Sequence, residues 1–157
     1  MRTLRFDDAG SPRFGRLDGD LVTPLDGAPW AGGREAGAPR PLSDLALLPP
    51  VPPGGKVLCI GRNYLAHAKE LGNEVPAEPL VFLKPSTSLL PHGGTVVLPP
   101  ESERGDFEGG LALVIGRRAR RVGREDFADV VFGVTPAFDI SARDLQKKDG
   151  QWWRAKG

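Results

Sequence analysis

Short apolar runs that each stop at a glycine or a proline limit most strongly how this chain can fold. Residues 56–60 (KVLCI), 80–84 (LVFLK) and 110–115 (GLALVI) are five or six residues long, a length typical of strands rather than of helices. The chain holds 21 glycines and 16 prolines in 157 residues, so turns are frequent. The pattern predicts a mainly β chain of the α+β kind, in which these residues separate ordered strands and do not signal disorder.

The segment 48–55 (LPPVPPGG) divides the chain into two regions. It has four prolines and two glycines, which is typical of a linker. Before it, three short apolar stretches around two turns between residues 2 and 25 predict a small antiparallel sheet. We therefore expect a small N-terminal β domain over residues 1–53 and a second domain over residues 56–157. In the second domain, we expect the first apolar run to be buried on both faces and the run before Gly116 to be a core strand.

Charge and cysteine content exclude several classes of protein. Lysine and arginine number 21 against 20 aspartates and glutamates, a net charge of +1, so we expect no nucleic-acid or membrane partner. One cysteine excludes an internal disulfide framework and a zinc site built from cysteines. The apolar runs stay far below the roughly 18 residues of a membrane span, and the N-terminus lacks the shape of a signal peptide. These features predict a cytoplasmic protein.

The first candidate site lies on a helix predicted from Asn63 to about Leu71, where His67 and Glu70 are three residues apart. Such positions share one helix face, so the carboxylate can orient the imidazole and raise its basicity. The pair would then suit a general base acting on water. A solvated helix face with an incidental histidine fits the same spacing.

Two carboxylates mark the start of the third apolar run. Asp106 and Glu108 are two residues apart and therefore face the same side of a strand. Carboxylates in this position suggest a site for a hard cation such as Mg²⁺, Mn²⁺ or Ca²⁺. A polar strand entry that binds nothing is the alternative.

A third candidate follows the apolar run that ends at Asp139. A carboxylate at a strand end lies at the edge of a site, and Arg143 could clamp a second carboxylate with its guanidinium. The alternative is a capping box of Ser141 and Asp144 at the start of a helix, with Arg143 in solvent.

Lys156 lies near the end of the sequence. Beside a metal ion, its ammonium could stabilise a developing enolate or oxyanion. Without such a neighbour it is an ordinary basic residue. The single cysteine, Cys59, lies within an apolar run, and we expect it to be an inert core thiol.

Taken in their order along the chain, these segments resemble the fumarylacetoacetate hydrolase family. The resemblance is carried by residues 56–64 (KVLCIGRNY), His67 with Glu70, and residues 79–85 (PLVFLKP), 106–116 (DFEGGLALVIG), 139–146 (DISARDLQ) and 151–157 (QWWRAKG). Residues 1–53 are similar to the small N-terminal domain of many bacterial members. The resemblance implies a mixed β-sandwich roll and a homodimer. Family chains continue beyond the Lys-Gly step, so we expect an incomplete roll, with residues 56–157 forming the N-terminal portion of the catalytic domain.

The resemblance also implies a reaction. Members of the family act on short 2-oxo or 1,3-diketo acids with the help of Mg²⁺ or a similar ion. Some hydrolyse a C–C bond in acylpyruvates or fumarylacetoacetate. Others isomerise 2-hydroxyhepta-2,4-diene-1,7-dioate or decarboxylate oxaloacetate. For this chain, a non-catalytic relative that only binds a ligand or a partner is the alternative.

The functional positions of the family fall on particular residues here. The catalytic dyad falls on His67 and Glu70, and Arg143 and Lys156 match residues that contact substrate. In the implied mechanism, His67 deprotonates a water, the hydroxide attacks the distal carbonyl, and the metal and Lys156 stabilise the enolate that leaves.

The three metal ligands of the family fall on Glu108, Gly110 and Asp139. Glycine supplies no side-chain ligand, so one of three protein carboxylates is missing. The resemblance therefore implies a metal site in which binding is weakened or lost.

Overall fold

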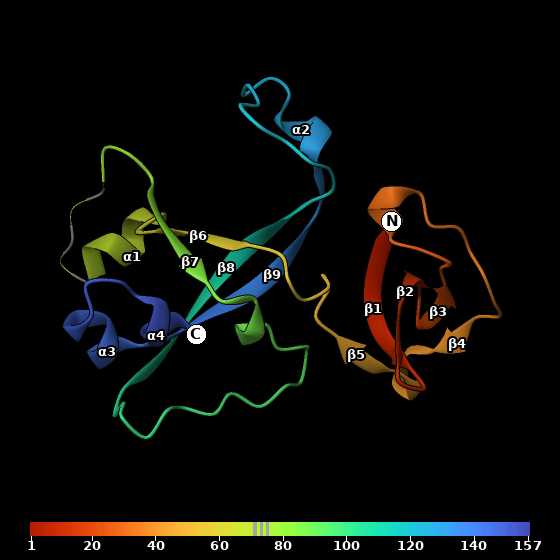
Figure 1. The fold of residues 1–157 in the computed structure, drawn as a ribbon, viewed down its shortest axis with the longest axis horizontal. Coiled ribbons are helices and arrows are strands. Elements are labelled where there is room, and N and C mark those ends of the chain that lie inside the picture. Colours follow the sequence, from red (N-terminus) through yellow and green to blue (C-terminus); the bar gives the residue numbers. More distant parts are fainter. Residues whose placement is uncertain (71, 73, 75) are drawn as a thin grey trace. The chain divides into compact units, whose positions relative to one another are not determined.

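The protein was analysed as a computed structural model (Figure 1). The structure describes all residues except 71, 73 and 75, and all side chains except these and those of His67, Ala68 and Glu70. Within this part of the chain strands hold many more residues than helices, which confirms the predicted mainly β class. The chain forms two compact units, and each is described separately.

The two units interleave along the chain. Unit 1 consists of Met1–Pro52, Leu90–Val96 and Gly109–Phe138, and unit 2 of Pro53–Leu89, Val97–Glu108 and Asp139–Gly157. The division into domains over residues 1–53 and 56–157 stays a prediction.

Unit 1 contains a five-stranded antiparallel sheet near the N-terminus. Its strands are β1 (Arg2–Asp8), β2 (Ser11–Asp18), β3 (Leu21–Pro24), β4 (Arg40–Pro41) and β5 (Ala46–Leu48), in the order β4-β3-β2-β1-β5. The 3₁₀ turns η1 (Pro29–Ala31) and η2 (Leu42–Asp44) lie between strands. Phe6 and Val22 are fully buried and pack with Leu45. The small N-terminal sheet predicted from the sequence is therefore confirmed.

Gly15 in β2 lies directly above this core. A Cβ atom at this position would lie 2.4 Å from Val22 Cγ1 and 3.3 Å from the Phe6 ring. We expect Gly15→Ala to lower the free energy of unfolding by about 1–3 kcal/mol, because the core would be overpacked. Urea unfolding followed by circular dichroism measures the change. Gly133→Ala is the matched control, since a Cβ there meets no described atom within 4 Å; equal losses in both variants would contradict the prediction.

Two long strands contribute residues to both units. They are β8 (Gly105–Ile115) and β9 (Val131–Ala142), with the short helix α2 (Phe127–Val130) before β9. Gly116 N donates to Val130 O at 2.8 Å, and Arg143 N donates to Arg104 O at 2.8 Å. These two bonds lie at opposite ends of the pair, so the strands are antiparallel.

Unit 2 is built on a second strand pair and four short helices. Strand β6 (Val57–Gly61) pairs antiparallel with β7 (Leu80–Lys84), and Cys59 lies opposite Phe82. The helical segments are α1 (Leu65–Glu70), η3 (Ser86–Ser88), α3 (Arg143–Lys148) and α4 (Trp153–Lys156). Each helix in the described part of the chain is too short or too polar to cross a membrane.

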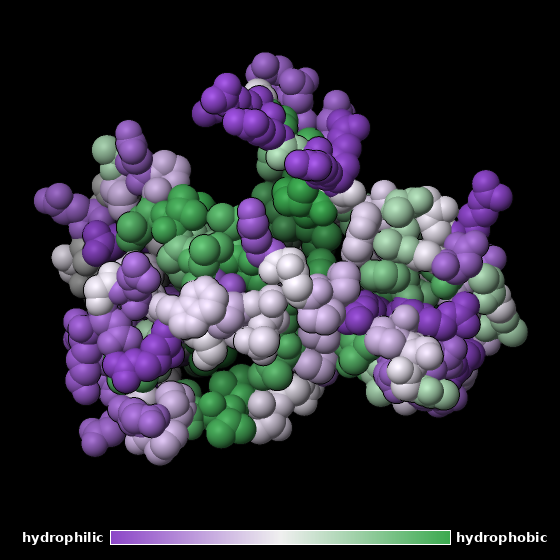
Figure 2. Space-filling model, in the orientation of Figure 1, coloured by the Kyte–Doolittle hydropathy of each residue, from purple (hydrophilic) through white to green (hydrophobic). Residues whose placement is uncertain are grey.

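The burial predicted for two strands is wrong. Leu58 and Ile60 of β6 are 63% and 45% exposed, and Leu111 of β8 is 61% exposed. The apolar run of β6 was expected to be buried on both faces, but its sheet has two strands and the outward residues are uncovered. Figure 2 shows apolar residues, in green, at the surface over β6 and β7. This outer face consists of Leu58, Ile60, Val81 and Leu83.

Candidate functional site

Lys156 is the centre of a group of charged residues in unit 2. Its side chain is 2% exposed, and Nζ donates to Glu108 Oε2 at 3.0 Å, to Asp139 Oδ2 at 2.7 Å and to Ser141 Oγ at 2.5 Å. An ammonium has three N–H donors, so these three protein groups engage all of them. The charge of Lys156 is thus fixed between two carboxylates from different strands.

Aromatic packing positions the helix that carries Lys156. The Trp152 ring meets the Phe82 ring edge-on with centroids 5.3 Å apart, and Lys156 N donates to Trp152 O at 2.9 Å. Lys156 Nζ lies 4.9 Å from the centre of the Phe82 ring, within range of a cation–π contact. Phe82 of β7 thus contacts both the start of α4 and the charge at its end.

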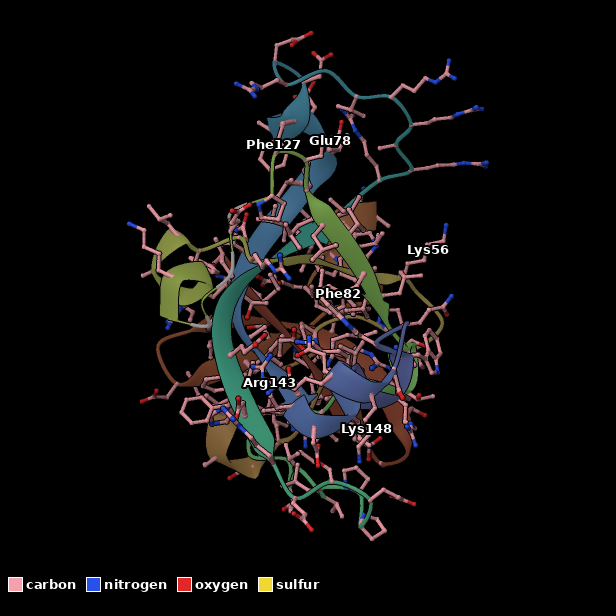
Figure 3. The ribbon with its side chains drawn as sticks, turned by 90° about the vertical axis from the view of Figure 1, so that its left-hand side faces the viewer. Lys56, Glu78, Phe82, Phe127, Arg143 and Lys148 are labelled. Carbon is pink, nitrogen blue, oxygen red and sulfur yellow. The ribbon has the colours of Figure 1, made fainter. Side chains whose placement is uncertain are left out.

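Arg143 binds the same carboxylates from the other side. Its guanidinium donates from Nε to Asp106 Oδ2 at 2.9 Å, from Nη1 to Gln146 Oε1 at 2.7 Å, and from Nη2 to Glu108 Oε1. The residue is 7% exposed, so the interpretation of Arg143 as a solvated side chain is wrong. Figure 3 shows Arg143 on α3 and Phe82 on β7 within this unit.

Lys84 completes the group, and the sequence analysis missed it. Its Nζ donates to Asp139 Oδ1 at 2.9 Å and to Ile140 O at 3.3 Å, and its side chain is 11% exposed. A lysine that ends an apolar run directly before Pro85 was the available signal. All four carboxylate oxygens of Glu108 and Asp139 therefore accept a hydrogen bond from a cationic side chain.

The proposed capping box does not form. The N-cap residue of α3 is Ala142, without a side-chain cap, and Ser141 is fully buried against Lys156. Asp144 instead accepts Ser102 Oγ–H at 2.6 Å and Glu103 N–H at 2.9 Å. The local pattern of Ser141 and Asp144 is thus used for contacts with distant segments.

Two ionisable groups near Lys156 have shifted pKa values. Burial alone would raise the pKa of Glu108, but hydrogen bonds from Arg143 and Lys156 outweigh it and lower the pKa to about 2. Burial, with the nearby Asp139 charge, raises the pKa of the Cys59 thiol. Glu108 is therefore ionised at neutral pH, whereas Cys59 stays protonated.

These contacts predict a specific loss of stability in acid. Hydrogen bonds from Ser102 and Glu103 lower the pKa of Asp144 from 3.8 to about 2, and the pKa of Glu108 falls from 4.5 to about 2. A lowered pKa in the folded state means that the unfolded state binds the proton more readily. The stabilisation is complete above about pH 4.5 and is lost as the pH falls towards 2. We expect the urea midpoint to fall through this window, and to fall less in Ser102→Ala; an unchanged midpoint would contradict the prediction.

The predicted dyad falls on α1. The side chains of His67 and Glu70 lie outside the described residues, so their roles stay predictions.

The described residues were tested for their fit to a divalent ion. They contain no group of three or more histidine, cysteine, aspartate or glutamate side chains that could hold a metal. Glu108 and Asp139 do converge, but they converge on the Lys156 ammonium. Gly110, the next residue on the Glu108 side of β8, supplies no third carboxylate. This donor set does not fit a divalent ion.

Comparisons with known proteins give the family. The profile of the fumarylacetoacetate (FAA) hydrolase C-terminal domain matches residues 56–157, and the Rv2993c-like N-terminal profile matches residues 1–50. The chain is similar to Protein Rv2993c of Mycobacterium tuberculosis, with 38% identity over 168 aligned residues, covering 100% of this chain and 62% of that protein. It is also similar to the mitochondrial oxaloacetate tautomerase FAHD1 of Arabidopsis thaliana, with 49% identity over 108 residues, covering 66% of this chain and 48% of that protein.

A solved structure extends the comparison to the fold. The 2-hydroxyhepta-2,4-diene-1,7-dioate isomerase of Mycobacterium marinum superposes with a TM-score of 0.83 at 35% identity, over 100% of this chain and 61% of that one. The predicted fold is therefore confirmed, and the chain spans between about half and three fifths of the length of these relatives. The profile match over residues 56–157, together with this superposition, shows that the chain belongs to the fumarylacetoacetate hydrolase family.

Proposed function

We propose that the protein hydrolyses a C–C bond in a 2-oxo acid of the acylpyruvate or fumarylacetoacetate kind. The observation that carries the proposal is the buried Lys156 ammonium held between Glu108 and Asp139, at positions matched to the family's site. Cleavage of such a bond leaves an enolate. A cation fixed in advance at this place favours the negative charge that develops on the enolate oxygen.

The residues of the chain have separate roles in this proposal. His67, oriented by Glu70, takes a proton from water, and the hydroxide attacks the carbonyl carbon distal to the carboxylate. The C–C bond then breaks, its electron pair forms the enolate, and protonation of the enolate carbon gives the smaller oxo acid. Lys156 Nζ contacts the enolate oxygen by releasing Ser141, its one neutral partner. Arg143 orients substrate through its hold on Glu108.

Members of this family typically use a divalent metal ion. We propose that Mg²⁺, or Mn²⁺ or Ca²⁺ in its place, binds this chain weakly or is lost, because Gly110 replaces a carboxylate and the described donors do not fit the ion. For that reason the steps given above involve side chains alone.

Isomerisation or tautomerisation is the second candidate. It is favoured by the relatives named as an oxaloacetate tautomerase and a 2-hydroxyhepta-2,4-diene-1,7-dioate isomerase. These reactions and oxaloacetate decarboxylation also pass through an enol or enolate of a 2-oxo acid, so the same cation serves them. The products distinguish them: hydrolysis gives two acids, decarboxylation releases CO₂, and tautomerisation changes the absorbance without a new product.

The test offers an acylpyruvate and oxaloacetate to the protein and follows enol absorbance and product formation. We expect His67→Ala and Glu70→Ala to lower the rate by about 10²- to 10⁴-fold. His92→Ala is the matched control, because His92 is the other histidine of the chain and is exposed. Unchanged rates in the first two variants would remove the assignment of the base. No turnover by the wild-type protein, together with saturable quenching of tryptophan fluorescence by the acids, would favour a non-catalytic binding protein.

The proposal includes the cytoplasmic location and the homodimer that the resemblance implies. Light scattering coupled to size-exclusion chromatography tests the dimer, and a monomeric mass at all concentrations would contradict it.

A further inference from the structure

The charged residues around Lys156 alternate in sign. From one end to the other they are Lys84, Asp139, Lys156, Glu108, Arg143 and Asp106, each in contact with the next. Three cations face three carboxylates in this row. Its formal charge is therefore zero without any added ion.

The ammonium in the middle of the row is placed as a shared metal ion would be. Glu108 Oε2 and Asp139 Oδ2 are 3.0 Å and 2.7 Å from Lys156 Nζ. The other oxygen of each carboxylate is bound to Arg143 or Lys84. An ion that bridged the two carboxylates would have to displace the ammonium, which is 2% exposed, and would add two positive charges to a balanced group.

We propose that Lys156 replaces the divalent ion in this chain, acting as a covalently attached cation that bridges Glu108 and Asp139. Two features support this inference independently. Position 110 has no carboxylate, so the ligand set is too small for a metal. Lys156 also uses all three of its donors within the protein, as expected for a bridging cation. The inference concerns the site of the proposed function, but its test measures metal binding and can fail while that function stands.

The test compares Mn²⁺ binding by the wild-type protein and by Lys156→Met. Calorimetry and thermal unfolding are measured with and without Mn²⁺. We expect no saturable site in the wild type. In Lys156→Met the two carboxylates lose their cation, so Mn²⁺ should bind at least about tenfold more tightly and raise the unfolding temperature. Adding Gly110→Glu to that variant should strengthen binding further.

Lys148→Met is the matched control, because Lys148 is exposed at the end of α3. It should remain without a saturable Mn²⁺ site. A one-to-one micromolar site in the wild type would overturn the inference. So would a folded Lys156→Met protein that binds Mn²⁺ no better than the wild type.

A second measurement on the wild type covers the case in which Lys156→Met does not fold. Reductive methylation followed by peptide mass spectrometry gives the reactivity of each lysine. We expect Lys156 to react far more slowly than Lys148, and millimolar Mn²⁺ to leave its rate unchanged. Faster methylation of Lys156 in the presence of Mn²⁺ would show that the ion displaces the ammonium, and would overturn the inference.

Discussion

Replacement of Lys156 by methionine is expected to lower the free energy of unfolding by about 3–5 kcal/mol. The change leaves the carboxylates of Glu108 and Asp139 without the cation between them and leaves Ser141 buried without its partner. Breaking a buried ion pair by removing one side costs much more than the pair contributes, because the remaining charge is desolvated and uncompensated. Urea unfolding at neutral pH with a chelator present gives the difference directly.

The control for this prediction is again Lys148→Met, for which we expect a change within about 0.5 kcal/mol, as for most surface substitutions. The effect of Lys156→Met should also shrink in acid, because protonation of Glu108 removes the charge that lacks a partner. A loss of similar size in both variants, or one independent of pH, would contradict the account of Lys156 as a buried bridging cation.

Arg143→Lys is expected to cost about 1.5–3 kcal/mol of stability although it keeps the charge. The guanidinium reaches Asp106, Glu108 and Gln146 with three different nitrogens. A lysine ammonium is a single point on a flexible stem and cannot reproduce this fork. We also expect the pKa of Glu108 to rise from about 2 towards its ordinary value of 4.5, which carbon NMR of the carboxylate can follow.

Arg154→Lys is the matched control for Arg143. Arg154 is paired with Asp149, but its side chain is 58% exposed, and exposed pairs contribute little because water screens them. We expect nearly unchanged stability and an unchanged pKa of Glu108. A Glu108 pKa that stays near 2 in Arg143→Lys would show that Lys156 alone holds that carboxylate ionised.

The fold was predictable where local pattern decides it. Runs ended by glycine or proline marked β6 and β7, and the turns near the N-terminus marked the first three strands. The faces of β6 and β8 were not predictable in this way. A short apolar run shows that a strand forms, but Leu58 and Leu111 are exposed because burial depends on which distant segment covers each face.

The candidate site was predictable to a similar extent. Carboxylates at strand ends indicated Glu108 and Asp139, and the resemblance supplied a role for Lys156. Lys84 was missed because its partner Asp139 is 55 residues away in sequence, and no local spacing connects them. Ser141 was assigned to a helix cap because its neighbours suit one, whereas its hydroxyl binds a residue 15 positions later.

The sequence distances within the charged row also bear on how unit 2 folds. Lys156 is 48 residues from Glu108 and 17 from Asp139, and closing such loops must precede the contacts that reward it. The row is therefore complete only when β7, β8, β9 and α4 have all met. An intermediate lacking one of them would hold desolvated charges without partners, which is costly. The site thus makes partly assembled forms of unit 2 unfavourable, and the loss of its ion pairs should coincide with the loss of its strands in a single transition.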